Sequence, residues 1–140
     1  MTQGITPETL RDAAASGVVL LDPGEAEAVL AAGTAAGLCC VRIDLAGCRS
    51  KPSLLARVAA ALEFPWWFGQ NWDALADCLG DLEWLPADGY LLLLDDPSEL
   101  RSAAPDDYAV AVEIFTDAAG EWRERRIPFW VFISGQQGAT

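Results

Sequence analysis

A chain of 140 residues that is 52% hydrophobic and contains six tryptophans can bury a real core, which excludes an intrinsically disordered protein and favours one domain. Its formal net charge of −12 argues against nucleic acid and anionic membranes as direct partners, because both would repel it. A basic protein surface or a cation is the natural counterpart. The chain starts with polar residues rather than a signal peptide and has no apolar run long enough to span a bilayer, so we expect a cytoplasmic protein.

The first half of the chain predicts a strand, a helix, a second strand and a second helix. Residues 17–22 form a short β-branched run closed by a Pro-Gly turn signal, and the alanine-rich residues 25–37 favour a helix that ends at a glycine. Residues 38–47 predict a strand with three apolar side chains on one face. Residues 50–64 place apolar side chains at helical spacing, with a proline in the first turn.

The second half predicts a helix that begins after Asn71, followed by a strand, a long helix and a last strand. Residues 88–96 form a continuous apolar run between turn signals, which is typical of a strand covered on both faces. Residues 105–125 have helical spacing, and residues 126–134 are rich in aromatic and β-branched side chains. Strands that alternate with helices predict an α/β fold with a small, mainly parallel sheet packed by helices.

The sequence offers little for catalysis. It contains no histidine, which is the commonest general base, and neither of the common glycine-rich nucleotide-binding patterns. The four cysteines have no zinc-binding spacing, and we interpret them as reduced structural thiols. Asp73 and Asp77 could hold a divalent cation but lack a third convergent ligand, so a carboxylate-metal hydrolase is the weakest alternative. We predict no catalytic residue, no metal site and no cofactor.

The acidic charge is concentrated between residues 58 and 122, where fourteen acidic residues accompany one basic residue. Asp73, Asp77 and Asp81 share one face of the predicted helix, and like charges one turn apart cost about 0.2–0.5 kcal/mol per pair. A solvated face would explain so small a cost. The aromatic bend at residues 65–69 immediately upstream favours a binding surface instead, because Trp side chains are enriched in interface hot spots.

The segment FPWWFGQNWDALADCL, residues 64–79, closely resembles the signature of the barstar family of intracellular inhibitors of microbial ribonucleases. The matching positions, in order, are Asn71, Asp73, Ala74, Leu75, Asp77, Cys78 and Leu79. The resemblance extends more weakly over about residues 40–134 and implies three parallel strands packed by helices. We therefore divide the chain into an N-terminal βα extension, residues 1–38, which could add a fourth strand to the same sheet, and a barstar-like domain, residues 39–140.

The resemblance also implies which residues contact a nuclease. In this family the acidic helix and the loop before it plug the nuclease active site, and the carboxylate at the position of Asp77 replaces a substrate phosphate. The remaining implied contacts are Trp67, in the place of a family tyrosine that packs on a catalytic histidine of the nuclease, Gly69 and Asn71, which shape the backbone, and the carboxylates Asp73 and Asp117. Asp81 adds a carboxylate at a position that is usually neutral in the family, and we add it to the candidate contacts. Gln70 and Ala76 depart from the family pattern, so part of the contact surface differs.

The sequence therefore predicts an inhibitor that binds and blocks a basic secreted or toxin ribonuclease inside the producing cell. We expect a monomer when the protein is free, with no cofactor and no direct contact with nucleic acid or membrane. The alternative is a barstar-fold interaction module that binds another basic protein and inhibits no nuclease. An activity assay separates these two functions, because only the first blocks RNA cleavage.

Overall fold

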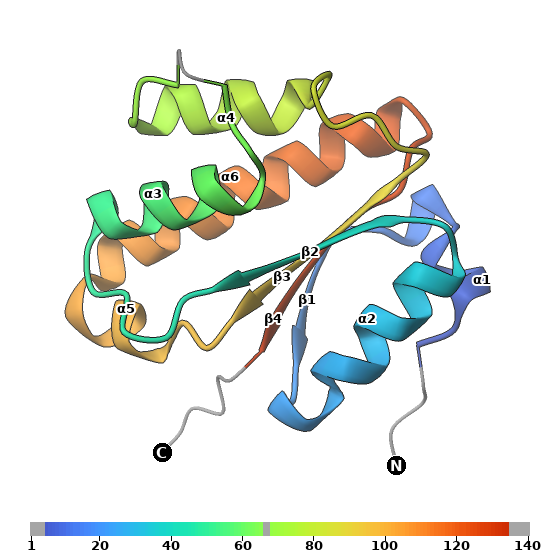
Figure 1. Cartoon of the computed structure of the whole chain (residues 1–140), viewed down its shortest axis with the longest axis horizontal. Helices are drawn as coiled ribbons and strands as arrows, with labels where there is room; N and C mark the ends of the chain where they lie inside the picture. Colours follow the sequence, from blue (N-terminus) through green and yellow to red (C-terminus); the bar gives the residue numbers. More distant parts are fainter. Residues whose placement is uncertain (1–4, 66–67, 135–140) are drawn as a thin grey trace.

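A computed structural model describes residues 5–65 and 68–134, and in these residues strands and helices alternate along the chain (Figure 1). The strands are β1 (Val18–Leu21), β2 (Cys39–Asp44), β3 (Tyr90–Asp95) and β4 (Phe129–Ser134). The helices are α1 (Pro7–Leu10), α2 (Ala26–Ala35), α3 (Lys51–Ala61), α4 (Trp72–Asp81), α5 (Ser98–Ala103) and α6 (Pro105–Glu124), with 3₁₀ turns η1 (Ala13–Ala15) and η2 (Pro23–Glu25). The predicted α/β fold is confirmed. Within the described residues, no helix combines the length and the apolar character needed to cross a membrane.

The four strands form one parallel sheet in the order β1-β4-β3-β2. Strand β1, from the N-terminal extension, pairs with β4 from Val18 opposite Val131 to Leu21 opposite Ser134. The extension therefore supplies a fourth, edge strand, as the sequence suggested. The division of the chain into two units at residue 38 stays a prediction.

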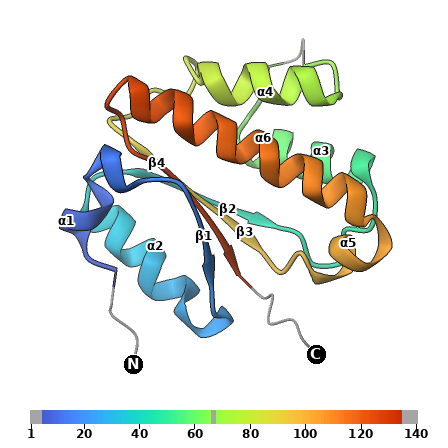
Figure 2. The same ribbon diagram turned by 180° about the vertical axis from the view of Figure 1, so that it is seen from behind.

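The direction of each crossover decides which face of the sheet its helix covers. The chain runs from β1 across the sheet to β2 through α2, and then returns through β3 to β4. Because crossovers between parallel strands are right-handed, opposite directions of travel place the helices on opposite faces. Helices α1 and α2 accordingly cover one face, while α3, α4 and α6 lie over the other (Figures 1 and 2).

Each face of the sheet has its own hydrophobic core. Alternate residues of β3 and β4 point to opposite faces, and both faces are covered, so every residue of the two strands except Asp95 is buried. For β3 this is the burial that its continuous apolar run predicted. The core under α1 and α2 is formed by Leu91, Leu93, Trp130 and Phe132 with Leu10, Leu21, Ala26 and Val29. The Trp130 indole Nε1 also donates a hydrogen bond of 2.9 Å to the carbonyl of Leu10, which ties α1 to the sheet. The larger core lies under α3, α4 and α6.

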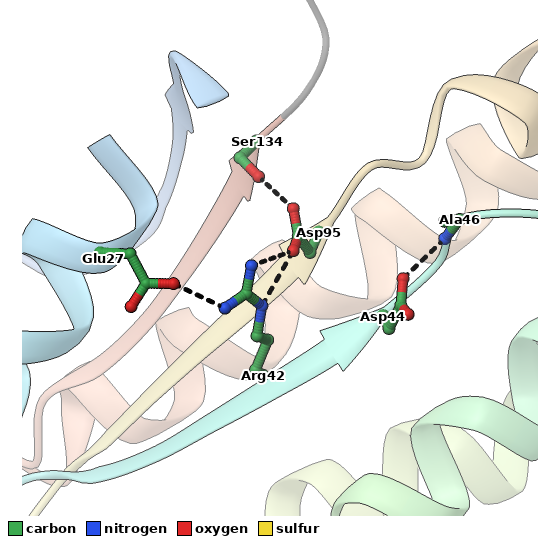
Figure 3. A network of polar contacts seen from close by, with 6 residues as sticks. All are labelled: Glu27, Arg42, Asp44, Ala46, Asp95 and Ser134. Atoms are coloured by element: carbon green, nitrogen blue, oxygen red, sulfur yellow. Dashed lines mark hydrogen bonds and ion pairs between the residues drawn. The ribbon is translucent and has the colours of Figure 1, made fainter. Parts of the chain in front are cut away.

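A polar network joins the extension to the carboxyl ends of three strands (Figure 3). Arg42 on β2 donates from Nε and Nη2 to one carboxylate oxygen of Asp95 on β3, over 2.9 and 2.6 Å. Its Nη1 reaches Glu27 on α2 over 2.9 Å. The buried Ser134 hydroxyl on β4 donates to the other oxygen of Asp95 over 2.9 Å. One arginine thus links α2 to the sheet.

Candidate functional site

Helix α4 begins and ends at local signals in its own sequence. The side-chain oxygen of Asn71 accepts a hydrogen bond of 2.8 Å from the backbone N–H of Ala74, which confirms the predicted N-cap. Asp73 follows in the first turn, where a carboxylate is favoured by the helix dipole. The helix ends at Asp81, and its C-cap, Leu82, adopts a left-handed backbone conformation with φ of 51°.

One face of α4 is buried and the opposite face is in solvent. Leu75, Leu79 and Leu82 are buried in the larger core, and Cys78 is buried as well. Trp72 is only half-buried, and the Nζ atom of Lys51 lies 4.8 Å from its ring centroid, a cation–π contact that also covers the ring. On the solvent face, Asp73, Asp77 and Asp81 are all exposed.

The carboxyl end of α4 is held against α6. The last carbonyls of a helix have no partner within the helix and need outside donors. The indole Nε1 of Trp122 donates to the carbonyl of Leu79 over 2.8 Å, and Nη1 of Arg125 donates to the carbonyl of Gly80 over 2.9 Å. The Arg125 guanidinium also lies over the Trp122 ring, 4.4 Å from its centroid. These contacts fix the acidic helix on the domain.

A shallow depression between α4 and α6 brings acidic side chains of both helices together. Its lining residues are Ala76, Asp77, Gly80 and Asp81 from α4 and Glu121 and Arg125 from α6. A Cβ atom at Gly80 would lie 3.0 Å from Oε1 of Glu121, so a side chain at this position would crowd the depression unless the exposed Glu121 side chain moved. Asp77 and Asp81 are therefore brought together with Glu121, a residue that sequence reasoning missed.

The other residues predicted to contact a nuclease lie outside this depression. Asp73 is one turn before Asp77 on the same exposed face of α4. Asp117 is exposed on α6, one turn before Glu121, and this four-residue spacing is the signal that could have pointed to Glu121. Gly69 is exposed, and its carbonyl is 3.4 Å from the side-chain amide of Asn71. Trp67 lies outside the described residues.

The loop before α4 is anchored by aromatic contacts. The Phe64 ring meets the Phe68 ring edge to face with centroids 4.9 Å apart, and the Trp84 ring at 5.9 Å. The indole Nε1 of Trp84 donates to the carbonyl of Leu62 over 3.0 Å. Immediately before the N-cap, Gln70 has a φ of 56°, a left-handed conformation that turns the chain into α4.

Within residues 5–65 and 68–134, the carboxylates on α4 have no cationic partner. Among the described residues, none forms an ion pair with Asp73, Asp77 or Asp81, and the ion pairs of Arg42 lie elsewhere. Burial raises the pKa of the neighbouring Cys78 thiol, and the charges of Asp77 and Asp81 raise it further. That thiol is therefore neutral at physiological pH, which fits a structural role. Among the residues that the structure describes, no group of three or more His, Cys, Asp or Glu side chains is placed to hold a metal ion.

Comparison with known protein families supplies the remaining observation. A family model described as Barstar (barnase inhibitor) matches residues 38–134, from just before β2 to the end of β4. The matched region contains α4, the depression and α6, whereas α1, β1 and α2 lie outside it. Among curated proteins, none matches this chain. Because the family model matches most of the sequence, the chain belongs to the barstar family of barnase inhibitors.

Proposed function

We propose that this protein binds a basic microbial ribonuclease inside the producing cell and blocks its active site with the exposed face of α4. Membership of a family of barnase inhibitors supports the class of partner. The proposed mode of binding rests on one observation: Asp73, Asp77 and Asp81 are exposed and form no ion pair with any described residue. They lie on a helix whose other face is buried and whose end is held by α6.

The proposed chemistry is imitation of substrate phosphate by carboxylates. A ribonuclease cleft is built from Arg, Lys and His donors aimed at an anion, and such donors bind carboxylates through strong charge-assisted hydrogen bonds. Four helical residues rise about 6 Å, so α4 presents its three carboxylates at regular steps along a rigid axis. Rigid presentation lowers the ordering cost of binding. Asp77, the middle of the three, takes the phosphate position.

The other predicted contacts surround Asp77 in this proposal. Asp73 and Asp81 supply flanking charge, Gly69 and Asn71 shape the approach to the helix, and Trp67 and Asp117 add further contacts with the nuclease. The net charge of −12 would attract a cationic nuclease over long range and speed the encounter. Added salt should therefore slow association more than it speeds dissociation.

An RNA cleavage assay tests the proposal directly. This protein is titrated into a panel of small basic microbial ribonucleases, beside an Asp77→Ala variant and an Asp22→Ala control. Asp22 is exposed in the N-terminal extension, outside the family match, and its side chain makes no capping hydrogen bond, so its loss removes the same charge elsewhere.

We expect stoichiometric inhibition by the wild type and the control. The Asp77→Ala variant should bind about 30-fold to several thousand-fold more weakly, which corresponds to the roughly 2–5 kcal/mol lost when one partner of a buried, hydrogen-bonded charge pair is removed. Equal loss in both variants would contradict a specific role for Asp77. Binding without inhibition would instead identify an interaction module.

A further inference from the structure

Arg125 is a positive charge within the surface that we propose for a cationic nuclease cleft. It lines the depression between α4 and α6 beside Asp77, Asp81 and Glu121. Its position is fixed by two contacts, the 2.9 Å hydrogen bond from Nη1 to the Gly80 carbonyl and the stacking of its guanidinium on Trp122. A cation held at this point would repel the same Arg and Lys side chains that the carboxylates attract.

Arg125 forms no direct ion pair with any described residue. Although three carboxylates line the same depression, no N···O distance of 4.0 Å or less joins Arg125 to an acid among the described residues. The side chain is exposed. A guanidinium has five N–H donors, and the hydrogen bond to Gly80 uses one of them, so most of its donors face solvent.

A partner that covers this surface removes the water that solvates Arg125. An unpaired charge in a closed interface is strongly unfavourable, so the partner must supply an acceptor. The best acceptor is a carboxylate, because its two oxygens match the planar fork of a guanidinium. Stacking on Trp122 lowers the entropic cost of this pairing, since the guanidinium is already in place.

We propose that Arg125 is a specificity-determining residue, which selects nucleases carrying an Asp or Glu side chain among the cations that meet Asp77 and Asp81. This inference rests on the proposed function and deepens it. A nuclease with a uniformly cationic rim is rejected at this position, and one with a matching acid is retained. The surface therefore recognises a pattern of charge rather than net charge alone.

A double-mutant cycle tests this inference on a nuclease that the wild-type protein inhibits. Arg125→Gln is combined with replacement, one at a time, of each acidic residue on the rim of the nuclease active site by its amide. The matched control is Arg126→Gln, because Arg126 is equally exposed but does not line the depression. Arg125→Lys keeps the charge and a donor for Gly80 while losing the planar fork, and it replaces the Gln variant if that variant does not fold.

We expect Arg125→Gln to weaken binding at least 10-fold and Arg125→Lys to weaken it less, while Arg126→Gln has little effect. One acidic residue of the nuclease should account for this loss, so that Arg125→Gln has almost no effect on affinity once that residue has been replaced by its amide. Unchanged or tighter binding by Arg125→Gln, or the absence of any coupled acid, would overturn the inference while Asp77-dependent inhibition still stands. Failure of the wild type to inhibit any nuclease would overturn the proposed function and this inference together.

Discussion

Replacement of Asp77 separates the effect of this side chain on the stability of the free protein from its effect on nuclease binding. Asp77 is exposed and has a like charge one turn away on each side, at Asp73 and Asp81. At about 0.2–0.5 kcal/mol for each pair, Asp77→Asn should raise the free energy of unfolding by about 0.4–1 kcal/mol. Asp77→Ala should add up to about 0.5 kcal/mol more, because alanine is the better helix former.

Thermal unfolding of the free protein at low and high salt measures these two contributions separately. For a chain of this length, 1 kcal/mol corresponds to about 3 °C in the midpoint temperature. The gain from Asp77→Asn should vanish near 1 M salt, where the Debye length is about 3 Å. The additional gain from alanine should remain, because helix propensity does not depend on ionic screening.

The result that would refute this reasoning is a lower midpoint temperature for Asp77→Asn at low salt. Such a loss would mean that the carboxylate stabilises the fold through a contact in the free protein, and Asp77 would then be structural. A stability gain in the same variant that loses inhibition would instead show that the acidic face is maintained for binding at the expense of stability. The two measurements together therefore distinguish a structural carboxylate from a functional one.

Three further predictions concern other parts of the structure. Arg42→Met should lower the free energy of unfolding by about 1–3 kcal/mol in urea titrations, because the Asp95 side chain, which is only 22% exposed, then keeps the Ser134 hydroxyl as its single strong donor. Glu27→Ala should change the free energy of unfolding by less than about 0.5 kcal/mol, because the Glu27 side chain is 81% exposed. Gly80→Ala should leave the midpoint temperature unchanged or slightly raised, yet weaken nuclease inhibition because the added methyl group narrows the depression beside Glu121. Burial raises the pKa of the Cys78 thiol above its ordinary value of 9.0. The stability that the protonated thiol contributes is therefore complete below about pH 9 and is lost as the pH rises through the folded-state pKa. Between about pH 8 and 10.5, the urea denaturation midpoint should fall less in Cys78→Ala than in the wild type.

The parts of the fold that were predicted correctly have local causes. Gly37, expected to end a helix, has a φ of 84°, and the following N–H of Leu38 donates back to Gly33 over 3.0 Å, as a Schellman motif requires. Asn71 caps α4 through its own side chain. The unbroken apolar run of β3 reflects burial on both faces. In each case the residues that decide the structure are neighbours in sequence.

Short helices and tertiary contacts could not be read from the sequence. Helices α1 and α5 were not predicted, because four to six residues are too few to show helical periodicity, although Thr6 caps α1 through its side chain. Glu121 and Arg125 belong to the surface around α4 only because α6 packs across the end of that helix. The four-residue spacing from Asp117 could have pointed to Glu121, but no local pattern shows that Arg125 faces α4.

The pairing of β1 with β4 has a consequence for folding during synthesis. Trp130 reaches the carbonyl of Leu10 across 120 residues, and β1 pairs with β4 in the sheet. The N-terminal segment therefore leaves the ribosome long before the strand that it pairs with, and loop closure over this distance delays its docking. Until β4 has been translated, β1 has no strand to pair with, and α2 can pack only on β2 and β3. A nascent chain stalled before Phe129 should therefore be the species most prone to aggregation and most dependent on chaperones.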